Sequence, residues 1–132
     1  MNRIVILGTG HATVTRCYNT CFVLQTDTTT LLVDAGGGNG ILQRLEQAGI
    51  AIKDLHHMYV THAHTDHILG TIWVIRMVLS AAGYEGRFHV YSHAKVLRVI
   101  SMICGETLSA KHRRLMGERV VMHEVGDGTG FN

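Results

Sequence analysis

The sequence predicts an α/β domain in which helices flank a mixed β-sheet. Short runs rich in β-branched and aromatic residues, typical of strands, alternate along most of the chain with longer segments whose apolar residues recur at helical spacing. The first three strand-like runs follow one another without a helical pattern between them, which favours a β-meander at the start. With 132 residues, 46% of them hydrophobic and 17% charged, the chain is one domain or part of one.

The predicted meander consists of strands at 3–7, 21–24 and 31–33. A glycine pair, Gly8 and Gly10, follows the first strand and suggests dinucleotide binding. A third glycine at the required spacing is absent, and no helical pattern begins there. The meander is therefore favoured, and a small nucleotide-binding protein is kept as a minor functional alternative.

Further along, Asn39 is a predicted N-cap and Gly49 a predicted C-cap of a helix with one apolar face. Ser92 is predicted to cap a later helix. His56 and His57 are expected to be solvated turn residues, not ligands. The remaining predicted elements are a strand at 58–60, a buried helix at 68–79, a strand at 88–91, an apolar helix face across 96–103 and a strand at 119–125.

The stretch that carries chemistry is Thr-His-Ala-His-Thr-Asp-His at 61–67, between the strand at 58–60 and the buried helix. In an extended segment, residues two apart point the same way, so His62 and His64 can bind one ion. The turn into the helix can aim Asp66 and His67 at a second position. Imidazole and carboxylate ligands suit zinc, iron or manganese, and two ions about 3.5–4 Å apart could share a hydroxide nucleophile.

This HxHxDH pattern, placed before a glycine-containing helix, resembles the metallo-β-lactamase superfamily, and the segments 4–10 and 31–36 agree with it. The chain is most similar to the ribonuclease Z-like branch of metal-dependent hydrolases. The resemblance implies half of an αββα sandwich. After His67 nothing matches the ligands that the second half supplies, and His123 lies before the expected ligand position. Residues 1–132 are therefore expected to be a single truncated domain, the N-terminal half.

The resemblance implies a zinc-dependent hydrolase, a phosphodiesterase similar to ribonuclease Z, that uses a metal-activated water as the nucleophile. His62, His64, Asp66 and His67 would be the metal ligands, and Asp66 would also be the catalytic residue that takes a proton. Asp34 would either support the site or order its loop. Because ligands are missing, enzyme activity is left open, and the alternative is a non-catalytic metal-binding half-domain that needs self-association or a partner.

A half-sandwich leaves one sheet face and a strand edge uncovered. We therefore expect a homo-oligomer or a missing C-terminal half as partner, and RNA or another phosphodiester as substrate. The net charge of +2 is scattered, unlike a nucleic-acid surface, and the basic run Lys111–Arg114 is interpreted as a solvated face.

A reducing cytoplasm is expected, because the N-terminus has no signal peptide. Cys17 and Cys21 have the spacing of zinc ligands, but no second pair accompanies them. They and Cys104 are therefore predicted to be buried free thiols. The apolar helix at 68–79 is too short to span a bilayer, so no membrane association is expected.

Overall fold

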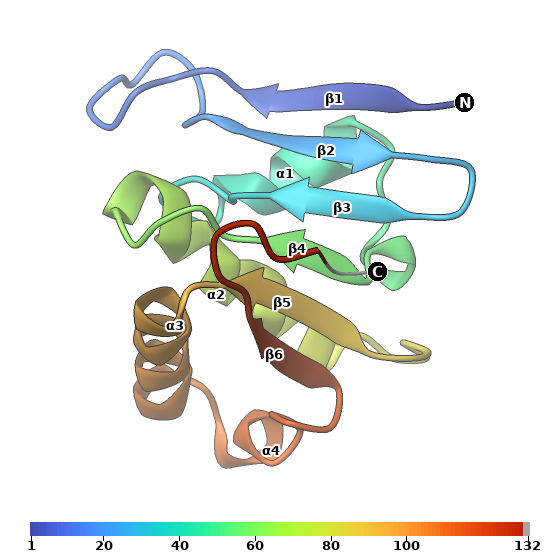
Figure 1. Cartoon of the computed structure of the whole chain (residues 1–132), viewed down its shortest axis with the longest axis vertical. Helices are drawn as coiled ribbons and strands as arrows, with labels where there is room; N and C mark the ends of the chain where they lie inside the picture. The colour runs from blue at the N-terminus through green and yellow to red at the C-terminus, as the bar shows by residue number, and fades with distance from the viewer. Residues whose placement is uncertain (131–132) are drawn as a thin grey trace.

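The computed structural model describes residues 1–130 and confirms the mixed α/β architecture (Figure 1). The strands are β1 (Arg3–Gly8), β2 (Cys21–Gln25), β3 (Thr30–Val33), β4 (His57–Tyr59), β5 (Phe88–Ser92) and β6 (Val120–Glu124). The helices are α1 (Gly40–Gln47), α2 (Thr65–Ser80), α3 (Ala94–Thr107), the short α4 (Ala110–Arg113) and the 3-10 helix η1 (Ile52–Asp54).

The described strands form one sheet in the order in which they occur along the chain. The pairs β1–β2 and β2–β3 are antiparallel, which confirms the meander. The pairs β3–β4, β4–β5 and β5–β6 are parallel, and each is joined through a helix. Because parallel strands end at the same edge of a sheet, the residues that follow Val33, Tyr59 and Ser92 meet there, where α/β proteins place their ligand sites.

The hydrophobic core lies between the sheet and its helices. Every second residue of each strand points to the helix side, and burial of each such apolar side chain contributes about 1.5–3 kcal/mol. The core includes Val23, Leu32, Met58, Val90 and Val120 from successive strands, Ile41 and Leu45 from α1, Val74 and Val78 from α2, and Val96 and Ile100 from α3.

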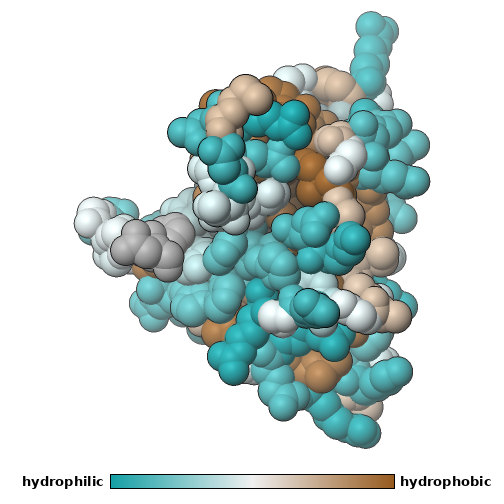
Figure 2. Space-filling model, turned by 90° about the vertical axis from the view of Figure 1, so that its right-hand side faces the viewer, coloured by the Kyte–Doolittle hydropathy of each residue, from teal (hydrophilic) through white to brown (hydrophobic). Residues whose placement is uncertain are grey.

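The opposite face of the sheet carries exposed apolar residues at its meander end. Ile4, Ile6 and Leu24 are 63%, 59% and 36% exposed, and the pairing register places them on one face with Leu31 and His57. The side of the molecule seen in Figure 2 shows hydrophobic surface only in separate patches among hydrophilic atoms. Other exposed apolar side chains lie on the helices: Trp73 and Met77 on α2, and Met102 on α3.

Further along the same face, histidines from three adjacent strands form a cluster. It includes His57, which was predicted to be a solvated turn residue but is the first residue of β4. The His57 and His89 rings stack with centroids 5.4 Å apart, and Nδ1 of His89 lies 2.8 Å from Nε2 of His123. Burial, together with the neighbouring histidines, lowers the pKa of both His57 and His89 below the ordinary value of 6.5. At neutral pH these two imidazoles are consequently uncharged, so they add no charge to the face.

Two predicted helix starts need correction. Helix α2 begins at Thr65, earlier than predicted, so Asp66 and His67 belong to its first turn. Ser92 does not cap α3: it is buried in β5, where its hydroxyl donates to the Val60 carbonyl oxygen at 2.6 Å, as a buried hydroxyl needs a partner. His93 is the N-cap instead. Asn39 is the N-cap of α1, but its side chain makes no capping hydrogen bond to the described residues.

The glycine pair after β1 has a packing role. A Cβ at Gly8 would collide with the Asn19 carbonyl oxygen, and one at Gly10 would collide with the Val14 side chain. The Gly10 N–H donates to the Tyr18 carbonyl oxygen at 2.8 Å. These glycines let the loop before β2 fold closely onto β1, which accounts for them without a nucleotide.

The cysteine prediction was right for Cys21 and Cys104, which are buried, and wrong for Cys17, which is exposed because the loop before β2 lies on the surface. Burial raises the pKa of Cys21 to about 12 and that of Cys104 to about 11, so both thiols stay protonated.

Of the helices in residues 1–130, none combines the length and the apolar character needed to cross a bilayer.

Candidate metal centre

The candidate metal-binding side chains are gathered at the carboxyl edge of two neighbouring parallel strands. Asp34 directly follows β3, and Thr61 and His62 follow β4. The backbone N–H of Asp34 donates to the Tyr59 carbonyl oxygen at 2.9 Å, which extends the ladder past the strand ends. The extended segment then reaches His64, the N-cap of α2.

Asp34 is the hub of a buried hydrogen-bond network. It is only 5% exposed. Its Oδ1 accepts from the Thr61 N–H at 2.8 Å, and its Oδ2 accepts from the Thr61 hydroxyl at 2.7 Å. The same Oδ2 lies 2.7 Å from Nδ1 of His67. An ionised carboxylate only accepts hydrogen bonds, so Nδ1 of His67 must carry the proton.

The protonated nitrogen of His62 can be assigned in the same way, through its contact with Thr61. Its hydroxyl hydrogen is used toward Asp34, so its oxygen accepts from Nδ1 of His62, 2.7 Å away. Both His62 and His67 are thereby held with a proton on Nδ1, so this network does not use their Nε2 atoms; Nε2 of His67 instead faces Oδ2 of Asp66, 3.2 Å away. A histidine that binds a metal through one ring nitrogen usually donates the N–H of its other ring nitrogen to a carboxylate, a carbonyl oxygen or a water. Thr61 was missed in the sequence, although it directly precedes the cluster.

The predicted ligands form one cluster around His62. Its ring centroid lies 4.2 Å from that of His67 and 4.6 Å from that of His64. Oδ2 of Asp66 lies 3.2 Å from Nε2 of His67. His62 therefore neighbours both other histidines, whereas the sequence paired it with His64 alone. The assignment of His62, His64, Asp66 and His67 as ligands, and their division between two ions, stays a prediction.

The donor set fits a divalent ion. One ligand atom each from Asp34, His62 and His67 can be chosen so that all lie within 4.8 Å of one another. Atoms bound to one zinc ion at about 2.0–2.2 Å lie about 3.3–3.6 Å apart in a tetrahedron, so these groups would have to draw somewhat closer to bind one ion. Imidazole with carboxylate suits zinc, iron or manganese. Because both oxygens of Asp34 already accept hydrogen bonds, its contacts match the supporting role better than direct ligation.

The loop that carries Asp34 is clamped on two sides. Asp34 has a positive φ of 57°, a strained conformation for a residue other than glycine. The Tyr18 hydroxyl oxygen lies 2.7 and 2.8 Å from the Ala35 and Gly38 carbonyl oxygens, which share its single hydrogen. On the other side, the N–H of Gly70 in α2 donates to the Gly36 carbonyl oxygen at 2.8 Å. The clamp keeps the carboxylate against His67 in spite of the strain.

A pocket of about 490 Å³ opens beside the cluster. One wall is Thr61 to His64, and the other consists of His93, Lys95, Val96 and Val99 at the start of α3. In the sequence neither His93 nor Lys95 belongs to a ligand motif, so neither stands out. Both follow β5, and the rule that parallel strands end at one edge could have placed them near the cluster.

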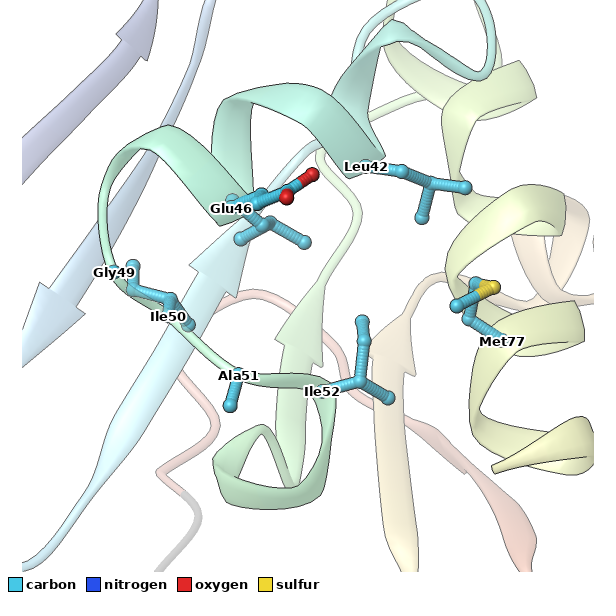
Figure 3. A pocket seen from close by; sticks show the side chains of 8 residues that line it. Leu42, Glu46, Gly49, Ile50, Ala51, Ile52 and Met77 are labelled. Atoms are coloured by element: carbon cyan, nitrogen blue, oxygen red, sulfur yellow. The ribbon is translucent and has the colours of Figure 1, made fainter. Parts of the chain in front are cut away.

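A second hollow, of about 430 Å³, lies away from this edge, between α1, η1 and α2 (Figure 3). Its lining is apolar apart from the Glu46 carboxylate, and it contains none of the predicted ligands. Figure 3 shows Leu42, Ile52 and Met77 pointing toward the same space. Glu46 is the one ionisable side chain among the described residues that line it, so the candidate site remains at the carboxyl edge.

The architecture is that of the metallo-β-lactamase fold. The crystal structure of human tRNase Z, short form, matches with a TM-score of 0.74 and 20% identity, covering 94% of this chain and 44% of that one. The metallo-β-lactamase fold protein YhfI from Bacillus subtilis matches with a TM-score of 0.69 and 17% identity, covering 98% and 48%. At these identities the likeness shows the fold, and it confirms the expected half-sandwich class.

Residues 2–115 match the sequence model of the family described as Anti-Pycsar protein Apyc1, and the chain belongs to this family. Ribonuclease Z of Streptomyces avermitilis is 37% identical over 79 residues, which are 59% of this chain and 26% of that protein. Ribonuclease Z of Aeropyrum pernix is 31% identical over 114 residues, 85% of this chain and 34% of that protein. The ribonuclease Z-like resemblance is confirmed, and the chain spans about a third or less of these relatives' length.

Proposed function

We propose that this chain provides part of the active centre of a metal-dependent phosphodiesterase similar to ribonuclease Z. The observation that carries the proposal is the network in which Asp34 and Thr61 engage Nδ1 of His67 and of His62, so that Nε2 is the nitrogen that each ring presents to the site. The relatives named Ribonuclease Z support the phosphodiester class. Zinc is the expected metal, with two sites, and manganese or iron are the alternatives.

In this proposal His62, His64, Asp66 and His67 hold the metal. When bound, the metal supplies Lewis acidity and lowers the pKa of a coordinated water toward about 7. Asp34 keeps the His62 and His67 rings turned toward the site, which avoids the entropic cost of ordering them. Asp66, with its carboxylate beside His67, accepts the proton of the attacking water at a carboxylate oxygen.

The test is hydrolysis of bis-p-nitrophenyl phosphate by the gently purified chain, with metal content measured on the same sample. We expect turnover that needs zinc or manganese, that is lost in His64→Ala and that persists in His11→Ala, a control at an exposed histidine outside the cluster. Turnover that survives chelation, or that does not depend on His64, would contradict the proposed site.

The second candidate function is a non-catalytic metal-binding half-domain. It is favoured by the short span of the chain relative to its curated relatives, and by the ligand count: four ligands shared by two ions leave each of them short of the usual three or four protein groups. Tight stoichiometric metal without turnover in the same experiment would select this candidate.

For partners, we propose self-association or docking of a C-terminal half on the uncovered sheet face, and a cytoplasmic location. At micromolar concentration, sedimentation velocity should show a species larger than the monomer. Ile6→Lys should shift it toward the monomer, because Ile6 is 59% exposed on that face, whereas Met102→Lys on α3, at a site 62% exposed, should not. A compact monomer in the unmodified protein would contradict self-association.

A further inference from the structure

The pocket beside the cluster has two walls of different chemistry. His62 and His64 lie on one wall, and the start of α3 forms the other, with His93 and Lys95 at its exposed rim. Val96 is buried and Val99 half-buried, so part of the lining from α3 is apolar. The volume of about 490 Å³ falls within the range of small-molecule sites.

Lys95 brings an uncompensated positive charge to this pocket. Within residues 1–130, no carboxylate oxygen lies within ion-pair distance of its ammonium group. His93 lies two residues earlier, on the same wall, and an imidazole N–H can donate a hydrogen bond. A lysine ammonium next to such a donor, in a pocket shared with His62 and His64, suits an anionic group such as a phosphate.

We propose that Lys95 and His93 bind a non-bridging phosphate oxygen of a phosphate-ester substrate and so position its phosphorus against the His62–His67 cluster. The apolar groups of Val96 and Val99 would contact the organic part of the ester. The expected effect of these two residues on turnover rests on the proposed phosphodiesterase function. Their binding of phosphate does not depend on that function. Neither residue would bind the metal or take part in proton transfer.

Four variants test this inference: Lys95→Ala, His93→Ala, the conservative Lys95→Arg, and Lys111→Ala as a matched control on α4. In the metal-loaded protein, Lys95→Ala should raise KM for bis-p-nitrophenyl phosphate about tenfold, as expected for loss of one charge-assisted hydrogen bond, with a smaller change in kcat. Lys95→Arg should restore KM, and Lys111→Ala should leave it unchanged. Unaltered KM in both alanine variants of the pocket would overturn the inference.

A second measurement does not depend on metal or turnover. Inorganic phosphate is titrated into the chelator-treated protein at constant ionic strength, and backbone amide resonances are followed by NMR. Saturable shifts are expected at Ala94 and Val96, and their loss is expected in Lys95→Ala but not in Lys111→Ala. If these shifts are absent in the unmodified protein, or persist in Lys95→Ala, the inference is wrong. If phosphate binds there but no ester is hydrolysed, the proposed function fails and the binding site stands.

Discussion

Replacing Asp34 with alanine should lower zinc affinity by about 10- to 100-fold, the loss typical when a partner behind metal-binding histidines is removed. The carboxylate receives hydrogen bonds from both Thr61 and His67, and through Thr61 it also fixes His62. Without it, two rings lose the partner that sets their tautomer. Hydrolysis of the phosphodiester should fall with metal occupancy. Competition titration against a chromogenic zinc chelator measures the affinity.

Backbone strain must be separated from the loss of the carboxylate. Asp34 has a left-handed φ, which alanine tolerates less well than asparagine does. Asp34→Asn keeps this conformation accessible, but it places an amide, which both donates and accepts, where three donors converge. It should therefore also weaken zinc binding. Asp27→Ala, in the exposed turn between β2 and β3, is the control. Zinc affinity equal to that of the unmodified protein in Asp34→Asn would refute the supporting role.

Substituting Gly70 with alanine should destabilise the fold by about 1–3 kcal/mol, the usual cost of overpacking. A Cβ at this position would overlap the Ala35 carbonyl group, so α2 and the Asp34 loop would have to separate. The cost outweighs the gain of about 1 kcal/mol that alanine normally brings to a helix interior. Because the Gly70–Gly36 hydrogen bond holds the same loop, zinc affinity should fall as well.

Gly105 in α3 is a matched control, because alanine at this position is expected to raise the free energy of unfolding. No described heavy atom lies within 4 Å of a Cβ built there, so Gly105→Ala should stabilise the protein by about 0.5–1 kcal/mol. Urea unfolding followed by circular dichroism measures both changes. Equal and positive stability changes in the two variants would show that α2 does not press on the Asp34 loop.

Local pattern was enough to predict much of the fold. The meander, the strand before the cluster and the buried helix after it all follow from features within a few residues of one another, because side-chain periodicity is a local property. The HxHxDH spacing likewise identifies the candidate ligands, because they all lie within six consecutive positions. Local signals failed at Ser92, where burial in a strand outweighed the capping preference of serine.

What the sequence determined by itself is therefore the order and type of the strands and longer helices, and the presence of a ligand-rich turn between β4 and α2; the short η1 and α4 were not predicted. The tertiary structure decided which groups support that turn. Asp34 reaches His67 across 33 residues of chain, and His93 and Lys95 share a pocket with His62 and His64. The physical reason is the parallel pairing of β3, β4 and β5, which brings their carboxyl ends to one edge of the sheet, a proximity that no local spacing encodes.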